Sequence, residues 1–379
     1  MKFSVLQENL QRGLATVMPA VATRTTMPIT THVMLQTDES RLRLTATNLE
    51  LSISCWISAS VETQGSVAIP ARLFSDYVSS LQRDRVDLEL DTGTRQLNII
   101  SGRFNTHMSG LDADDFPPTP VADDGINAEV PPDVLRAGID RVIIAAATED
   151  SRPVLTGVHT SIEGDSITMA AADGFRLAVQ TTRLPQEVSE GVDLIIPARS
   201  LRELNRMLTE QEMPVRVTVN QAKTQVQFHL SNIVLGSQLI QGNFPNYRQL
   251  IPESSNTQTS VEVADFLRAT KTAAVFAREG NGIVRLYMTP GENEMAGTMR
   301  LEARSDQIGD HEGVIDANIG GEEAHIAFNH RYLEDVLGVL NSTATLEVSG
   351  PSSPGTIRPA TTDDGTDYVH VVMPMFVQW

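Results

Sequence analysis

The stretch AIPARLF at residues 68–74 returns twice in modified form, as IIPARSL at 195–201 and AFNHRYL at 327–333. Arg72, Arg199 and Arg331 therefore lie 127 and 132 residues apart. Two further sets of similar segments recur at nearly the same spacing. The prolines of LDADDFP (111–117), IQGNFPNY (240–247) and VVMPMF (371–376) are 128 and 129 residues apart, and LQRGLATV (10–17), LRAGIDRV (135–142) and LRATKTAAV (267–275) start 125 and 132 residues apart. This period is too long for a solenoid repeat, so the chain is predicted to contain three similar domain-sized modules.

Within each module, alternating and helical apolar patterns predict an α+β domain with two helices on one side of its sheets. In module one we expect strands at 2–6, 32–37, 42–47, 49–61, 86–91 and 96–101. Apolar spacing predicts a helix at 9–21, which Pro19 should kink or end early. It also predicts a second helix after Pro70, with Leu73, Tyr77, Val78 and Leu81 on its apolar face. In module two, Pro131-Pro132-Asp133 marks a helix start and Gly164-Asp165 a hairpin turn.

The predicted modules run from 1 to 120, from 127 to 252 and from 258 to 379. Polar, proline-containing joints separate them at 118–127 and 252–258.

Composition narrows the class of protein. The 379 residues are 41% hydrophobic, without an apolar run of about 18 residues that would cross a membrane. The start of the chain lacks the apolar region of a signal peptide, and we expect a cytoplasmic protein. Cys55 is the only cysteine, which excludes an intrachain disulfide and a multi-cysteine metal site. It is expected to be a packed core residue.

The charge is unevenly distributed. The formal net charge is −19, yet the six predicted helices, at 8–24, 72–85, 130–148, 197–209, 264–278 and 331–340, hold 14 basic and 9 acidic residues. The remainder holds 15 basic and 39 acidic residues. Any one helix could simply have a solvated charged face, but a shared bias indicates a helix surface suited to a polyanion.

No catalytic motif is recognisable. The sequence lacks a GxxxxGK[ST] phosphate loop, a GxGxxG turn, HExxH and GxSxG. Asp112, Asp114 and Asp115 are expected to solvate a loop, GPSSPG at 350–355 to form a turn, and TTDDGTD at 361–367 lacks the spacing and closing glutamate of a calcium loop. We therefore expect a non-catalytic protein with no cofactor and no metal.

The segment SRPVLTGVHTSIEGDSITMAAADGFRLAV at 151–179 resembles the bacterial DNA polymerase III β subunit, the replicative sliding clamp. The same holds for the opening MKFSV, for RTTMPITTHVML from Arg24, for QGNFPNYRQLIP from Gln241 and for YVHVVMPM ending at Met375. The resemblance implies a head-to-tail homodimer that closes six similar domains into a ring, with helices inside and sheets outside. It further implies sequence-independent encirclement of duplex DNA. The implied protein partners are the replicative polymerase, a clamp-loader ATPase, and other polymerases and repair proteins that bind through short peptides.

The resemblance also implies a partner-peptide groove between modules two and three. Its matching positions are Leu155, Asp173, Gly174, Phe175, Arg176, Leu177, Pro245, Arg248, Pro354, Val371, Val372, Met373, Pro374 and Met375. Two departures concern peptide preference. Ala172 replaces a common threonine, and Phe376–Trp379 extends the usual end. This tail could fold over the groove or line it, and lining is favoured because Phe376 is expected to continue the last strand.

Two further sets follow from the same resemblance. The basic side chains expected to face DNA are Arg24, Arg72, Arg83, Arg136, Arg141, Arg152, Arg199, Arg202, Arg206, Arg268, Lys271 and Arg278. Ring closure is expected to join Phe74, Val78, Thr106 and Met108 of module one to Val275 and Phe276 of module three, with Asp310 or Glu312 paired to Arg103 or another base.

Two other classes remain open. A repeat-built scaffold would have the groove without the basic helix bias, and DNA-dependent loading by an ATPase would exclude it. An enzyme with an unrecognised site would need a convergent catalytic set.

Overall fold

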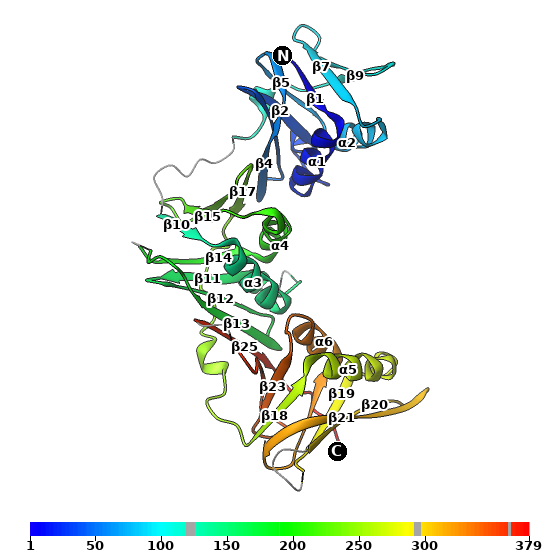
Figure 1. Cartoon of the computed structure of the whole chain (residues 1–379), viewed down its shortest axis with the longest axis vertical. Coiled ribbons are helices and arrows are strands. Elements are labelled where there is room, and N and C mark those ends of the chain that lie inside the picture. The colour runs from blue at the N-terminus through cyan, green and yellow to red at the C-terminus, as the bar shows by residue number, and fades with distance from the viewer. Residues whose placement is uncertain (119–125, 150, 189, 292–296, 363–364, 379) are drawn as a thin grey trace. The chain divides into compact units, whose positions relative to one another are not determined.

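The computed structural model describes residues 1–118, 126–149, 151–188, 190–291, 297–362 and 365–378. These residues form two compact units (Figure 1). The first unit comprises Met1–Asp133 and Arg199–Leu239, and the second comprises Val134–Ala198 and Ile240–Trp379. Most of the predicted joint at 118–127 lies outside the described residues, and the module boundaries 1–120, 127–252 and 258–379 stay a prediction.

The helices occur at equivalent places in the three repeats. Their bounds are α1 Gln7–Val17, α2 Ala71–Ser80, α3 Pro132–Val142, α4 Ala198–Met207, α5 Val263–Arg278 and α6 His330–Gly338. Helix α1 packs against α2, and α5 packs against α6. Asn329 caps α6, because its side chain accepts a hydrogen bond from the Arg331 N–H and so satisfies a donor that the first turn leaves unpaired.

The first unit contains two antiparallel sheets, of five strands (β5-β1-β7-β8-β9) and eight strands (β10-β15-β16-β17-β4-β3-β2-β6). The strand bounds are β1 Lys2–Leu6, β2 His32–Asp38, β3 Arg41–Thr47, β4 Leu51–Ser58, β5 Ser60–Thr63, β6 Ser66–Pro70, β7 Arg85–Asp91, β8 Gln96–Ser101, β9 Phe104–Ser109, β10 Ile126–Val130, β15 Val215–Val219, β16 Gln225–His229 and β17 Ile233–Gln238.

The second unit contains a sheet of twelve strands in the order β14-β11-β12-β13-β25-β24-β23-β18-β21-β20-β19-β22. The bounds are β11 Gly157–Glu163, β12 Ser166–Ala172, β13 Arg176–Arg183, β14 Val192–Pro197, β18 Thr257–Glu262, β19 Ile283–Thr289, β20 Gly297–Ser305, β21 Gly309–Gly321, β22 Ala324–Asn329, β23 Thr343–Val348, β24 Gly355–Pro359 and β25 Thr366–Val372.

Strand pairing joins consecutive modules. Strand β17 of module two pairs with β4 of module one, with Ile233 opposite Cys55. Strand β25 of module three pairs with β13 of module two, with Val369 opposite Val179. Each joint is therefore a continuous antiparallel sheet, in which backbone hydrogen bonds hold one module to the next.

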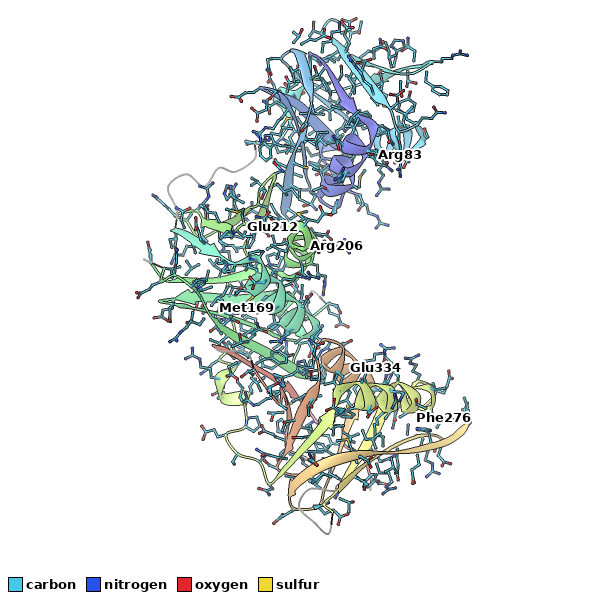
Figure 2. The ribbon with its side chains drawn as sticks, viewed as in Figure 1. Arg83, Met169, Arg206, Glu212, Phe276 and Glu334 are labelled. Atoms are coloured by element: carbon cyan, nitrogen blue, oxygen red, sulfur yellow. The ribbon has the colours of Figure 1, made fainter. Side chains whose placement is uncertain are left out.

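A glycine at the same place in two repeats lets a helix lie close to its sheet. A Cβ on Gly13 of α1 would come within 2.5 Å of Leu44 Cδ1, and one on Gly138 of α3 within 2.7 Å of Met169 Sδ (Figure 2). Thr270 takes this position in α5 and is fully buried. The LQRG and LRAG motifs are therefore helix–sheet contact signals in the first two modules.

Three sequence predictions need correction. Helices α1, α3 and α4 are shorter than predicted because single 3-10 turns, such as Met18–Ala20 with Pro19, continue the apolar pattern after the α-helix ends. Helix α2 ends at Ser80 and not at residue 85, because Leu81 is already extended. The predicted strand 49–61 is two strands, β4 and β5, preceded by Leu49 with a φ of +76°. Leu73, predicted to lie on the apolar face of the second helix, is 59% exposed. The neighbouring Phe74 is buried in the core in its place.

Candidate functional site

The second joint presents a tight turn at the start of β13. Asp173 Oδ1 accepts hydrogen bonds from the N–H groups of Phe175 (2.9 Å) and Arg176 (3.0 Å). Gly174 has a φ of +94°, a conformation that side chains with a Cβ rarely adopt. The Phe175 carbonyl in turn accepts a hydrogen bond from the Met373 N–H at 2.8 Å. The turn and the segment after β25 are thereby fixed side by side.

An apolar cluster forms the floor beside this turn. Leu177 and Val371 lie opposite each other in the β13–β25 pair and are each 2% exposed. Tyr247 packs on the same cluster, together with partly buried Phe244. The Phe244 ring stacks on His159 with centroids 5.4 Å apart, so the 244–251 segment covers one side of the sheet.

Exposed apolar side chains surround this floor. Phe175 is 60% exposed, Met373 43% and Leu250 50%. Pro245 and Arg248 are exposed, whereas Pro354, Pro374 and Met375 are half-buried. Leu155, Leu177, Val371 and Val372, predicted to contact a peptide, are all buried in the core. They can support the exposed side chains from below but offer little surface to a ligand.

The first joint repeats this construction with polar side chains. Asn48 Oδ1 accepts from the N–H groups of Glu50 (3.1 Å) and Leu51 (2.9 Å). Ser52 lies opposite Gly236 where the second joint places Leu177 opposite Val371. A cavity of about 280 Å³ here is lined by Thr47, Leu49, Glu50, Ser52, Pro117, Pro118, Gln225, Val226, Gln227, Gly236, Ser237 and Gln238. The two joints thus share a backbone, and the second has more of the large exposed apolar side chains, with Phe175, Met373 and Leu250 against Leu49 at the first.

Arg176 is held by charges rather than presented to solvent. Its Nε lies 3.0 Å from Asp173 Oδ2 and its Nη1 2.6 Å from Asp335 Oδ2. The guanidinium also lies over the Tyr332 ring, 4.5 Å from the centroid. Its side chain is 11% exposed. Arg176 therefore fastens the turn to α6.

The last residues leave the strand. Strand β25 ends at Val372, and the Met375 N–H donates to the Ala327 carbonyl at 2.8 Å. Phe376 is 86% exposed, and Gln378 lines a cavity with residues of β19 to β21. The expectation that Phe376 continues β25 is wrong, because the chain turns onto β22 instead. Trp379 lies outside the described residues.

The predicted DNA-facing side chains differ in their availability. Arg141 is half-buried, lies over the Tyr368 ring and donates to Gln180. Ion pairs within 4.0 Å engage Arg83, Arg136, Arg199, Arg206, Arg268 and Arg278. The remaining members of the set are exposed and, within the described part of the chain, have no acidic partner at that distance: Arg24, Arg72, Arg152, Arg202 and Lys271.

The helix charge bias is smaller than predicted. Within the observed bounds the six helices hold 11 basic and 8 acidic residues, and the excess lies in α4 and α5. Arg24, Arg83 and Arg152 lie outside these helices. A polyanion-facing surface would therefore depend mainly on α4 and α5.

Two strand edges carry side chains suited to a contact. Strand β9 is the last strand of the five-stranded sheet, and β21 pairs with β20 along Gly309–Ala317 while reaching β18 only at Asn318–Gly321. Exposed apolar side chains accompany both edges, namely Phe104, Leu73 and Ile100 in the first unit and Val275, Ile308 and Val314 in the second.

The predicted closure residues divide into two groups. Phe74 and Val78 are 0% exposed and Met108 is 6% exposed, so these three belong to the core of their own module. Their buried side chains could support a contact surface from within, and their place at the closure stays a prediction. Thr106, Val275, Phe276, Asp310 and Glu312 keep accessible surface. Phe276 stacks on His311 of β21 at 5.8 Å (Figure 2), and Glu312 already pairs with Arg300.

No group of three or more His, Cys, Asp or Glu side chains in the described ranges is arranged to hold a metal ion. Among the described helices, none has both the length and the apolar character needed to cross a bilayer. Cys55 is buried, and burial raises the pKa of its thiol to about 11.

Three repeated α+β modules joined by strand pairing, with exposed apolar side chains gathered at the second joint, define the clamp class of fold. Family models of the DNA polymerase III beta subunit match residues 1–120 (N-terminal domain), 129–246 (central domain) and 248–376 (C-terminal domain). The chain belongs to this family.

The similarity to individual relatives extends over nearly the full length of the chain. The beta sliding clamp of Bacillus subtilis is 32% identical, with 99% of each chain covered, and that of Synechocystis is 34% identical with the same coverage. The solved structure of the DNA polymerase sliding clamp from Bacillus subtilis has a TM-score of 0.92, 30% identity and full coverage of both chains. A sliding clamp from Pseudomonas aeruginosa, solved bound to griselimycin, has a TM-score of 0.90 and 26% identity over both full chains.

Several residues that lie beside the predicted peptide-binding residues were not themselves predicted from the sequence. Tyr247 and Phe244 flank the predicted Pro245, and their aromatic character was a usable signal. Tyr332 and Asp335 both contact Arg176, although Asp335 lies 159 positions later in the sequence. No local sequence pattern indicated either contact. Leu73 and Phe104 were missed as exposed edge residues because residue type alone does not distinguish an exposed from a buried apolar side chain.

Proposed function

We propose that this chain is a DNA sliding clamp, a ring-forming processivity factor that encircles duplex DNA and tethers a replicative polymerase. The observation that carries the proposal is the repeated strand joint. Strand β17 pairs with β4, and β25 pairs with β13. In the repeat, β9 of module one is equivalent to β17 and β25, and β21 of module three is equivalent to β4 and β13.

A second copy can therefore complete the series. Pairing of β9 from one copy with β21 of another repeats the existing joints, and doing so twice closes a head-to-tail dimer. Exposed apolar residues at both edges, Phe104 and Val275 among them, would be buried by this closure. Closed pairing also removes two free strand edges, which otherwise can promote aggregation.

The helices would then face the enclosed DNA. Binding by enclosure requires no base contacts, and exposed basic side chains such as Arg202 and Lys271 suffice for phosphate contacts. The strongly acidic remainder of the chain would keep DNA away from other surfaces.

The groove at the second joint would bind short peptides of polymerases, of the clamp loader and of repair proteins. Its exposed Phe175, Met373 and Leu250 supply adaptable apolar contacts over a buried floor. In this function the protein positions other enzymes and performs no catalysis of its own.

The experiment is primer extension by the cognate replicative polymerase on a singly primed circular template, with the clamp loader and ATP. Adding this protein should lengthen the product made in a single binding event by at least about tenfold, because a tethered polymerase rebinds before it diffuses away. Product lengths that do not change when the protein is added would refute the proposal.

A further inference from the structure

The Asp173-Gly174-Phe175 turn, one wall of the proposed groove, is connected to module three by the Phe175–Met373 backbone hydrogen bond and by the side chain of Arg176. Arg176 reaches Asp173 Oδ2 at 3.0 Å with Nε and Asp335 Oδ2 at 2.6 Å with Nη1. The Arg176 and Asp173 side chains are 11% and 15% exposed, whereas Asp335 is 44% exposed. Charge-assisted hydrogen bonds of this kind fix both distance and orientation.

Helix α6 also supplies a flat surface for the guanidinium. The Tyr332 ring centroid lies 4.5 Å from the Arg176 guanidinium carbon. Burial, followed by the nearby Asp173 carboxylate, raises the pKa of the Tyr332 phenol, which therefore stays neutral. The ring and the Asp335 carboxylate together leave the arginine one well-defined position.

The first joint shows that the turn itself needs no such network. There Asn48 makes the same two side-chain-to-backbone hydrogen bonds, and Leu51 takes the place of Arg176. A carboxylate on α6 is thus unnecessary for forming the turn. Glu50 of the first turn also reaches the neighbouring module, because its carboxylate lies 2.9 Å from Arg199 of α4. The second joint differs in that its contact is made by a nearly buried arginine, which also pairs with Asp173 of its own turn.

We propose that Asp335 is a positioning residue for peptide binding, which acts through Arg176 to fix the orientation of the Asp173–Phe175 wall of the proposed groove. This inference rests on the proposed peptide-binding function of the groove. Asp335 need not touch the peptide. It pre-organises the wall, and a pre-organised site loses less conformational entropy on binding.

The test variant is Asp335→Asn, which keeps the size of the side chain and removes its charge. Asp335→Glu is the conservative rescue. Glu334→Gln is the matched control, because the adjacent Glu334 bonds His330 at 2.7 Å and lies 3.7 Å from Arg278 instead (Figure 2). The probe is a synthetic peptide with a glutamine and two apolar residues near its end, titrated by calorimetry into the full chain.

We expect Asp335→Asn to raise the peptide Kd by about fivefold to tenfold, as loosened pre-organisation should. Hydrogen exchange at the Phe175 and Arg176 amides should quicken, while Asp335→Glu restores the Kd to within about twofold. Glu334→Gln should leave both readouts unchanged. An unchanged Kd for Asp335→Asn, or equal losses for Asp335→Asn and Glu334→Gln, would overturn the inference. A wild-type chain that binds no peptide would instead refute the groove itself, and this inference with it.

Discussion

Replacing Val275 with aspartate should open the proposed ring. Val275 lies on α5, which packs against β21, and is 60% exposed in the single chain. Full burial of a valine side chain contributes about 1.5–3 kcal/mol, so closure would gain roughly 1–2 kcal/mol from the part still exposed. A buried, unpaired carboxylate costs about a further 3–5 kcal/mol.

The two effects together weaken each interface by about 4–7 kcal/mol, or roughly a thousandfold or more in Kd. Sedimentation velocity between nanomolar and micromolar concentration measures the change. The wild type should sediment at about twice its 41.3 kDa mass and the variant as a monomer.

Met213→Asp is the matched control for this experiment, because Met213 is 65% exposed and belongs to neither edge, lying in the segment between α4 and β15. It should remain dimeric. A dimeric Val275→Asp variant, or dissociation of both variants alike, would refute the reasoning about the edge.

Three further outcomes are expected. Deleting residues 376–379 should change the peptide Kd by less than about twofold, because Phe376 leaves the strand and is 86% exposed; a larger change in calorimetry would show that the tail contributes to the groove. Burial, and then the charge of Arg176, lowers the pKa of His370 to about 3, so the stability that its neutral form supports is complete above pH 6.5 and is lost as the pH falls from 6.5 towards 3. The free energy of unfolding should fall by up to about 1.4 kcal/mol per pH unit in that range, and a His370→Gln variant that shows the same slope in urea titrations would contradict this origin. Replacing Arg72, Arg202 and Lys271 together with glutamine should shorten the lifetime of the protein on DNA and make that lifetime less dependent on salt. Replacing three exposed acidic residues away from the helices, Glu62, Asp165 and Glu187, should do neither, and equal effects of the two sets would exclude the helix face.

Much of the fold could be predicted because strands leave a clear pattern. Strands β1 and β8 begin and end at the predicted residues, and Gly164 forms the expected turn with a φ of +57°. Helix ends were less predictable. The apolar pattern continues into 3-10 turns such as Met18–Ala20, so the pattern indicates which residues are buried but not where the α-helix stops.

The residues of the proposed groove were named from the resemblance of separate segments, and the contacts among these residues could not be predicted in this way. Sequence order gives no distance between Arg176 and Asp335, which only the β13–β25 pairing brings together. At the edges, Leu73 and Phe74 are adjacent apolar residues with opposite exposure, because one faces solvent and the other the core. Residue type does not distinguish two such residues, because the exposure of each depends on the face of the helix on which it lies.

The most direct test of the clamp function is topological. The protein is loaded with ATP and a clamp loader onto a nicked circular duplex, free protein is removed by gel filtration, and the DNA is then cut once with a restriction enzyme. A ring that encircles DNA should remain on the circle and slide off the ends after the cut, so that most of the bound protein is lost within minutes. Retention that is equal on circular and linear DNA would contradict the account, because it would show that the protein holds DNA by surface contacts alone.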